Sequence, residues 1–390
     1  GEIVTELLEN PKLETSLFVE NLLKDQIRTK RSYPLRPRDV VLYGFGRIGR
    51  ILTRILVEDT GAGSKWRLRA IVIRPGTGKD DLIKRASLLR NDSIHGEFPG
   101  TIRVNKLNNS LIVNGNEIFI ISSENPRKTN YKQFGIKRAT LIDNTGVWTD
   151  EEGLSQHLKN PSIEKVILTA PAKGKIKNIV YGVNENRVNQ NDKILGAASC
   201  TTNAIVPALN IVDENFKILN GHIETVHAYT NDQNLIDNYH PSDRRGRSAA
   251  LNLVITNTGA AKAVSEVLPQ LKGKITANAI RVPTPNVSLA IMHLTVKKGV
   301  SIEDLNDCFR KAAFRSNLRE TMDYTNSIDA VSSDFYSNAF ALIYDSQATS
   351  TNFNNITIYC WYDNEYGYSK QVVRLLKKVL GVNLTRYPKL

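Results

Sequence analysis

The stretch that decides the fold is Val40–Gly49, with the sequence VVLYGFGRIG. Its first residues form an apolar run typical of a short buried strand, and residues 50–57 repeat apolar side chains at helical spacing. Gly44, Gly46 and Gly49 form a G-x-G-x-x-G motif between the two. In this context the glycines allow a tight turn, close approach of a pyrophosphate at the helix N-terminus, and close helix–strand packing. The stretch predicts an α/β domain with a Rossmann-type, doubly wound parallel sheet; a glycine-rich turn without a ligand is the alternative.

The second predicted strand, residues 68–73, bears on cofactor choice because it ends at Arg74. An NAD-binding fold usually carries Asp or Glu there to bind the 2′-hydroxyl of the adenosine ribose, whereas Arg suits a 2′-phosphate. Asp80 and Asp81 follow and would support NAD binding if the loop folds back. The sequence therefore favours NADP, or use of both cofactors, over strict use of NAD.

The remaining elements differ in character before and after residue 200. Before it, Asn114–Asn116 is typical of a hairpin turn, and small residues follow two strands at Asn144–Gly146 and Ala170–Pro171. Small residues at strand ends are where an open α/β sheet places its ligand. After it, long polar segments separate the strands, and Ser301 caps a predicted helix. Strands are predicted at residues 101–104, 110–113, 118–121, 140–143, 165–169, 223–230, 289–296 and 355–362, and helices at 301–314 and 370–380.

Composition narrows the class of protein. The chain has 390 residues, 41% hydrophobic and 23% charged, which suits a globular protein of two domains. A net charge of +13 fits either a nucleic-acid binder or an enzyme that attracts phosphorylated substrates. Lys and Arg are spread along the chain without an aromatic RNA-binding signature, which favours the enzyme. Residues 1–37 are expected to form a helix and a basic linker; their acidic residues and lack of an apolar run argue against a secretion signal.

Cysteine usage points to a reducing compartment, and thus to a cytoplasmic protein. Cys200, Cys308 and Cys360 are odd in number and widely spaced, so we expect neither a disulfide framework nor a metal site. Cys200 lies in Ala198–Asn203, ASCTTN, between a strand-like run and a helix start. The positive end of a helix dipole favours the reactive thiolate there. By itself such a cysteine is more often a buried structural residue.

Several motifs in order strengthen the catalytic interpretation. Besides the glycine and cysteine motifs, they are HAYT at 227–230, TGAAKA at 258–263, RVPTPNVS at 281–288 and WYDNEYGY at 361–368. Together they resemble the phosphorylating glyceraldehyde-3-phosphate dehydrogenases, from about residue 39 to the C-terminus. The resemblance implies a homotetrameric oxidoreductase whose second domain is α+β with a large, mostly antiparallel sheet. The expected domains are an N-terminal extension (1–37), a cofactor domain (38–199 plus 364–390) and a catalytic domain (200–363).

The resemblance implies that Cys200 and His227 carry the chemistry. Cys200 would attack the aldehyde of D-glyceraldehyde 3-phosphate to give a thiohemiacetal, and His227 would activate the thiol and hydrogen-bond the developing oxyanion. Hydride transfer to NAD or NADP would leave a thioester that inorganic phosphate attacks, giving 1,3-bisphosphoglycerate. An imidazole beside the thiol is also expected to lower the thiol pKa.

The same resemblance implies two anion sites and a cofactor site. The expected phosphate ligands are Ser199, Thr201, Thr230, Arg245, Thr258, Gly259 and Arg281. The expected cofactor-binding residues are Gly44, Gly46, Arg47, Ile48, Gly49, Arg74, Thr145, Gly146, Thr169, Asn364 and Tyr368. The neighbours Arg244 and Arg247 are expected to be solvated, inter-subunit or cofactor-facing.

Two departures from the family pattern and two alternatives accompany this interpretation. Ala204 stands where many members have a second cysteine, which removes a possible disulfide with Cys200, and Arg74 replaces the usual acidic residue. The segment 231–241 also resembles erythrose-4-phosphate dehydrogenase, a relative that keeps the Cys/His pair. The less favoured alternative is a non-enzymatic module that binds RNA or a protein. The sequence leaves open the physiological direction and the role of residues 1–37.

Overall fold

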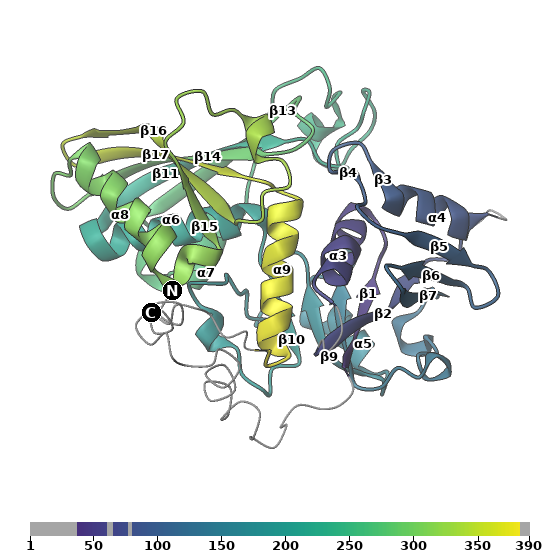
Figure 1. The fold of residues 1–390 in the computed structure, drawn as a ribbon. Coiled ribbons are helices and arrows are strands. Elements are labelled where there is room, and N and C mark those ends of the chain that lie inside the picture. Colours follow the sequence, from purple (N-terminus) through teal and green to yellow (C-terminus); the bar gives the residue numbers. More distant parts are fainter. Residues whose placement is uncertain (1–36, 61–64, 77–79, 383–390) are drawn as a thin grey trace, which may run out of the picture.

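The protein is described by a computed structural model that covers residues 37–60, 65–76 and 80–382. Figure 1 shows two lobes, each built on its own sheet, with helix α9 (Tyr366–Val379) standing between them. Residues 1–36, and with them the predicted N-terminal helix, lie outside the described residues.

The first sheet is the one that the glycine motif predicts. Its eight strands lie in the order β10-β9-β8-β1-β2-β7-β6-β5, and the strands from β10 to β7 are parallel. The strand order reverses beside β1, which creates the crevice where such sheets bind ligands. The bounds are β1 Arg38–Tyr43, β2 Trp66–Ile73, β5 Ile102–Asn105, β6 Ser110–Val113, β7 Asn116–Ser122, β8 Ala139–Asp143, β9 Ile163–Leu168 and β10 Ile194–Gly196.

Strand β1 is buried because helices cover both of its faces. Val40 and Leu42 point into a core with α3 (Arg47–Glu58) and α9, whereas Val41 faces the opposite core. The predicted hairpin turn is confirmed: β6 and β7 pair antiparallel through Asn114 and Gly115, both with positive φ. The other elements of this lobe are α4 Asp81–Arg90, α5 Glu151–Leu158, β3 Asn91–Asp92 and β4 Gly96–Glu97.

The second sheet is mostly antiparallel, as the resemblance implies. Its seven strands lie in the order β12-β13-β11-β14-β17-β16-β15, with parallel pairs only at β11–β13 and β15–β16. Helices α6, α7 and α8 cover one face (Figure 1). The bounds are α6 Cys200–Phe216, β11 Ile218–Ala228, β12 Val254–Thr256, α7 Ala260–Val267, β13 Ile275–Val282, β14 Ser288–Val296, α8 Ile302–Arg315, β15 Met322–Thr325, β16 Leu342–Asn352 and β17 Asn355–Tyr362.

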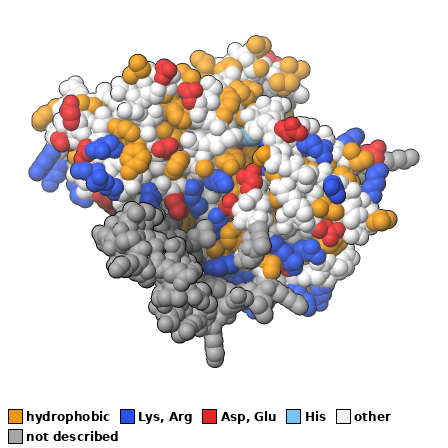
Figure 2. Space-filling view, in the orientation of Figure 1, with side chains coloured by type: hydrophobic (Ala, Val, Ile, Leu, Met, Phe, Trp, Pro, Cys, Tyr) orange, Lys and Arg blue, Asp and Glu red, His pale blue; other side chains and the backbone are white. Residues whose placement is uncertain are grey.

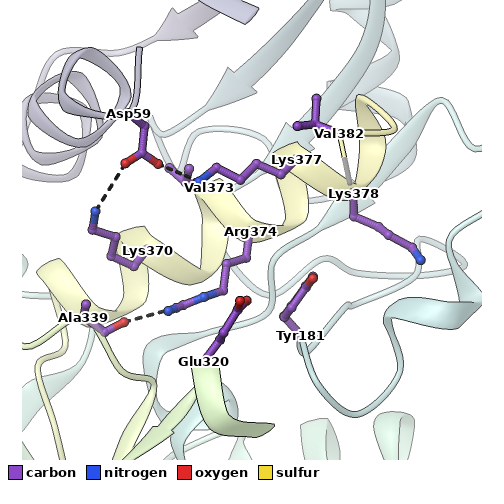
Figure 3. A pocket seen from close by; sticks show the side chains of 10 residues that line it. All are labelled: Asp59, Tyr181, Glu320, Ala339, Lys370, Val373, Arg374, Lys377, Lys378 and Val382. Carbon is purple, nitrogen blue, oxygen red and sulfur yellow. Dashed lines mark hydrogen bonds and ion pairs between the residues drawn. The ribbon is translucent and has the colours of Figure 1, made fainter. Parts of the chain in front are cut away.

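Helix α9 ties the two lobes together. Its apolar side packs in the core of the first sheet, and Lys377 Nζ lies 2.7 Å from Asp59 Oδ2 at the end of α3 (Figure 3). The helix begins four residues before the predicted start at Lys370. The reason is Asp363, whose Oδ1 accepts the backbone N–H groups of Glu365 and Tyr366 and so stabilises an earlier first turn.

Candidate active site

Cys200 is the first residue of α6, at the strand-to-helix junction that the sequence predicts. Ser199 is the N-cap, and its Oγ accepts a hydrogen bond of 3.0 Å from the backbone N–H of Thr202. The preceding residue, Ala198, has φ of 55°, a left-handed conformation that is costly for a residue with a Cβ. The Tyr368 hydroxyl donates to the carbonyl of Ala198 at 3.0 Å. Helix α9 thereby supports the strained turn that presents the thiol.

His227 reaches Cys200 from the second sheet. It lies near the end of β11, and its Nε2 is 3.6 Å from Cys200 Sγ. The parallel register of β11 and β13 places Arg281 directly beside it. Arg281 Nη1 lies 2.9 Å from His227 Nδ1 and donates to the carbonyl of Ala228 at 3.0 Å. Two adjacent strands therefore fix the orientation of the imidazole relative to the thiol.

The thiol and imidazole are held in their neutral forms, which differs from the expected thiolate. Burial, followed by the charge of Arg281, lowers the pKa of His227 to about 3. Burial raises the pKa of Cys200 and outweighs the lowering effects of Arg281 and of the Thr201 hydrogen bonds. The sequence-based expectation counted the helix dipole and the imidazole but not desolvation. A neutral imidazole is the form that can accept the thiol proton.

A cluster of cationic and polar side chains lies next to this pair. Arg281 Nη1 also donates to Thr230 Oγ1 at 3.1 Å, and the Thr230 hydroxyl contacts Asp232. Arg245 forms an ion pair of 2.8 Å with Asp232 and donates to Thr256 Oγ1 at 3.2 Å. The predicted residues Thr230, Arg245 and Arg281 are thus brought together. Sequence reasoning missed Asp232, the carboxylate that holds the cluster in place.

The other predicted phosphate ligands are less available. The hydroxyl of Ser199 is engaged in the helix cap, and Thr201 Oγ1 is buried 3.1 Å from the hydroxyl of Tyr362. Thr258 Oγ1 accepts from the backbone N–H of Ala260 at 3.2 Å. Gly259 precedes α7, and a Cβ there would meet no atom within 4 Å. The start of α7 therefore remains open.

Arg244 and Arg247 differ from Arg245 in their surroundings. Arg247 is exposed and pairs with Asp237 at 2.8 Å, away from Arg281. Arg244 lies with Arg245 in a short 3₁₀ turn, Asp243–Gly246. The choice of Arg245 as the phosphate ligand is the one that this geometry favours.

The glycine motif forms a cradle suited to a pyrophosphate. Gly44 has φ of +109°, and a Cβ there would lie 2.7 Å from Asn144 Oδ1. A Cβ at Gly49 would lie 2.5 Å from the carbonyl oxygen of Gly44, whereas one at Gly46 would meet nothing within 4 Å. The first and third glycines thus permit close packing, and the second leaves space at the start of α3. A cavity of about 510 Å³ adjoins this loop, lined by Tyr43, Gly44, Phe45, Gly46, Val72, Ile73, Arg74, Arg85, Ser123, Glu124, Thr145, Val147 and Trp148.

Asp143 positions the residues that follow β8 and β9. The Asp143 carboxylate accepts from the backbone N–H and the hydroxyl of Thr145, at 2.9 and 2.7 Å. Gly146 has φ of +69°, and the Thr169 hydroxyl donates to the Asp143 carbonyl at 3.2 Å. Ile48 is partly buried and packs against the core of this lobe. Of these residues, Thr145 lines the cavity that adjoins the glycine loop.

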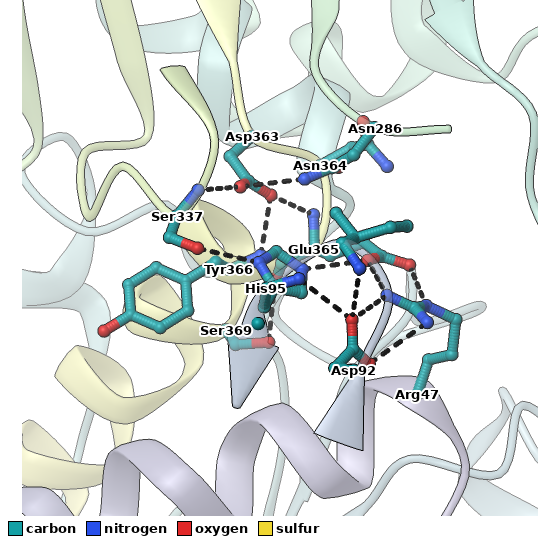
Figure 4. A network of polar contacts seen from close by, with 12 residues as sticks. Arg47, Asp92, His95, Asn286, Ser337, Asp363, Asn364, Glu365, Tyr366 and Ser369 are labelled. Atoms are coloured by element: carbon teal, nitrogen blue, oxygen red, sulfur yellow. Dashed lines mark hydrogen bonds and ion pairs between the residues drawn. The ribbon is translucent and has the colours of Figure 1, made fainter. Parts of the chain in front are cut away.

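The side chain of Arg47 lies in a polar network that sequence reasoning missed (Figure 4). The guanidinium of Arg47 is bound by Glu365 and, at 3.3 Å, by Asp92. His95 Nε2 lies 3.0 Å from Glu365. The side chain of Arg47 is therefore directed into this network, and only its backbone lies at the glycine loop.

The orientation of Asn364 is set from the second sheet. Its Oδ1 accepts from the Ser288 hydroxyl at 2.9 Å, and Ser288 Oγ in turn accepts from the backbone N–H of Ala228 at 3.1 Å. The amide of Asn364 is thereby linked to the strand that carries His227. Among the residues that the structure describes, no hydrogen bond engages Asn364 Nδ2.

Comparisons with known proteins agree with this geometry. A model described as the glyceraldehyde 3-phosphate dehydrogenase NAD-binding domain matches residues 38–151, and its C-terminal domain matches residues 199–364. A glyceraldehyde-3-phosphate dehydrogenase-like protein of Pseudomonas aeruginosa is 56% identical over 90% of this chain and 76% of its own length. A glyceraldehyde-3-phosphate dehydrogenase of Borreliella burgdorferi is 40% identical over 87% and 99%. The chloroplastic A form of Zea mays is 40% identical over 86% and 81%. This chain belongs to the glyceraldehyde-3-phosphate dehydrogenase family of NAD(P)-dependent oxidoreductases.

Proposed function

We propose that the chain oxidises D-glyceraldehyde 3-phosphate and captures inorganic phosphate, giving 1,3-bisphosphoglycerate. The observation that carries this proposal is the 3.6 Å approach of His227 Nε2 to Cys200 Sγ, beside the cluster of Arg281, Thr230 and Arg245. A nucleophile, a base and cationic anion ligands are the groups that the reaction requires.

Cys200 acts as the nucleophile of this reaction, and His227 acts as its base. His227 removes the thiol proton, and Cys200 Sγ forms a bond to the aldehyde carbon, giving a thiohemiacetal. The protonated imidazole then hydrogen-bonds the oxygen that was the carbonyl. Bound NAD(P)⁺, held by the glycine loop and Asn364, would supply the hydride acceptor, and loss of the hydride from that carbon would leave a thioester on Cys200. Attack by inorganic phosphate releases the acyl phosphate and returns the thiolate, which recovers its proton from His227.

Arg281 and Arg245 are suited to hold the two phosphates. Their guanidinium groups form charge-assisted hydrogen bonds with phosphate oxygens, which are stronger than neutral ones. Asp232 pairs with Arg245 and contacts Thr230, whose hydroxyl in turn accepts a hydrogen bond from Arg281. The open start of α7 at Gly259 offers backbone N–H groups as a further anion ligand.

The cofactor is NAD or NADP, and we propose a preference for NADP. Arg74 is exposed at the end of β2 and lines the cavity beside the glycine loop. A guanidinium at this position favours a 2′-phosphate over a hydroxyl.

We further propose a homotetramer located in the cytoplasm. Large apolar side chains are exposed on the loop after β11, at the top of Figure 2; they include Leu235, Ile236, Tyr239, Leu251 and Leu253, each more than two-thirds exposed. Exposed apolar side chains gathered on one loop are typical of a subunit interface. All three cysteines are free, as in a reducing compartment. Within the described residues no helix is long and apolar enough to cross a membrane.

The test is a steady-state assay of the purified chain with two aldehydes, with and without phosphate. The proposal expects strict dependence on phosphate with glyceraldehyde 3-phosphate. Turnover of erythrose 4-phosphate without phosphate, at a higher kcat/KM than the triose, would overturn it.

A further inference from the structure

Two arginines face the far end of the cofactor cavity. Arg74 follows β2, and Arg85 lies on α4, the helix that sequence reasoning did not predict. Both line the cavity of about 510 Å³ that adjoins the glycine loop. This end of the cavity lies beside the end of β2, where a Rossmann-type fold binds the adenosine ribose.

The carboxylate of Asp81 forms an ion pair with Arg85 and is therefore not directed at the ribose of the cofactor. Its Oδ2 accepts from Arg85 Nε at 2.7 Å, one turn apart on α4. The carboxylate also lies against the backbone of Gly76, where a Cβ would be only 2.7 Å from Asp81 Cγ. The sequence-based alternative gave Asp81 to the ribose of NAD, but here its charge is already paired with a guanidinium.

The remaining guanidinium nitrogens are free to bind an anion. Within residues 37–60, 65–76 and 80–382, no hydrogen bond or ion pair engages Arg74 or the two Nη atoms of Arg85. Glu124 lines the same cavity, but it is exposed to solvent, which weakens its repulsion of an anion. A ribose hydroxyl offers one uncharged oxygen, whereas a phosphate offers three charged oxygens that can accept charge-assisted hydrogen bonds from both arginines.

We propose that Arg74 and Arg85 together form a subsite for a phosphate monoester on the 2′-oxygen of the adenosine ribose, with Asp81 as the residue that orients Arg85. This inference rests on the proposed use of NAD(P). It adds Arg85 as a specificity-determining residue and changes the role of Asp81 from ribose ligand to support.

The probe is 2′,5′-ADP, compared with ADP, in calorimetric titrations of the full chain. Neither compound contains nicotinamide, so binding is measured without catalysis. We expect 2′,5′-ADP to bind at least tenfold tighter than ADP. Arg74→Gln and Arg85→Gln should each weaken 2′,5′-ADP by about tenfold and change ADP by less than about twofold, because each removes charge-assisted hydrogen bonds to the 2′-phosphate alone.

Two further variants separate the subsite from general charge effects. Arg310→Gln removes an exposed arginine on α8 of the other lobe and should leave both affinities unchanged. Asp81→Asn should weaken 2′,5′-ADP a few-fold because Arg85 loses its anchor; a pure charge effect would instead strengthen it, and that result would overturn the role of Asp81.

The outcomes also distinguish this inference from the proposed function. An unchanged 2′,5′-ADP affinity in Arg85→Gln would overturn the two-arginine subsite and leave Arg74 acting alone. Tighter binding of ADP than of 2′,5′-ADP by the unaltered chain would overturn the subsite altogether. Phosphate-dependent oxidation of the triose with NAD would stand in either case, because Cys200 and His227 are not involved.

Discussion

The catalytic centre and the adenosine end of the cofactor cavity are built in opposite ways. At the centre, His227 is 5% exposed, and its two ring nitrogens contact Cys200 of α6 and Arg281 of β13. At the adenosine end, Arg74 is exposed and has no polar partner among the described residues, and Arg85 has one. The chemistry thus depends on groups held rigidly by backbone and neighbouring side chains. The choice of cofactor depends on arginine side chains whose positive charges are paired only when a ligand binds.

This contrast has an energetic reason. A base and a nucleophile gain from fixed geometry and low solvation, because reorganisation during the reaction is avoided. A surface guanidinium that stays hydrated in the free protein keeps its hydrogen-bond donors available for a phosphate. Changes at the centre should therefore have large effects on rate, and changes at the adenosine end small effects on preference.

The largest effect is expected for Cys200→Ser. A serine hydroxyl has a far higher pKa than a thiol and would not be ionised by His227, so we expect kcat to fall at least about 10⁴-fold. The measurement is the initial rate of NAD(P)H formation. Cys308→Ser, on α8 of the same lobe, is the matched control and should keep full activity. A serine variant that retained more than about a hundredth of the rate would remove Cys200 from the mechanism.

The second-largest effect is expected for His227→Gln. Its kcat should fall about 10²- to 10⁴-fold, which is the range of general-base catalysis. His222→Gln is the matched control, since His222 lies on β11 but hydrogen-bonds Asn278 on the opposite, polar face. Neutral iodoacetamide should also alkylate Cys200 more slowly in the His227 variant at pH 7. Equal alkylation rates would show that His227 does not accept the thiol proton.

The same variant tests the low pKa of His227. The folded protein holds His227 neutral down to about pH 3, whereas in the unfolded chain it gains a proton near its ordinary pKa of 6.5. The unfolded state therefore binds more protons below pH 6.5, and stability is lost as pH falls from there towards 3. At pH 5 the loss should be about 2 kcal/mol for the unaltered chain relative to pH 8. His227→Gln should lack that part of the loss in urea unfolding.

Much of the contrast could be predicted from sequence, because local motifs encode the centre. The glycine motif, with its strand and helix, predicts the first lobe, and Cys200 at a helix start predicts the nucleophile. The network in Figure 4 could not be predicted, because Arg47 and Glu365 lie 318 residues apart. Arg85 was missed for a different reason: α4 buries only Ala86 and Leu89, too few apolar residues for a helical pattern.

Strands were missed where their alternation is weak. β13 reads ITANAIRV, and only two of its residues are buried, because the sheet leaves one face polar. The prediction of a lowered thiol pKa at Cys200 was wrong for a similar reason. Burial raises that pKa, and the burial depends on packing from α9 and β11. Burial by distant elements is the quantity that a single sequence does not provide.

A smaller effect is expected for Ser288→Ala, between the two regions. The change leaves the backbone N–H of Ala228 and Oδ1 of Asn364 without their shared partner. Because the Asn364 amide loses this support, kcat/KM for the cofactor should fall about 30- to 100-fold, or about 2–3 kcal/mol, which is within the range that an unsatisfied buried group costs. Ser265→Ala, whose hydroxyl bonds only its own helix, is the control. A change below about twofold would show that Asn364 is oriented by other groups.

The smallest effect is expected for Arg74→Asp, at the adenosine end. The carboxylate would repel a 2′-phosphate and could accept from the 2′-hydroxyl of NAD, so the ratio of kcat/KM for NADP over NAD should fall about 20-fold. The rate with NAD at saturation should stay within about twofold, because Cys200 and His227 are untouched. A fall in both cofactors' rates would instead mean that the two regions are coupled. If the unaltered chain does not use NADP, the Arg74 guanidinium does not bind a 2′-phosphate, and the proposed NADP preference is wrong.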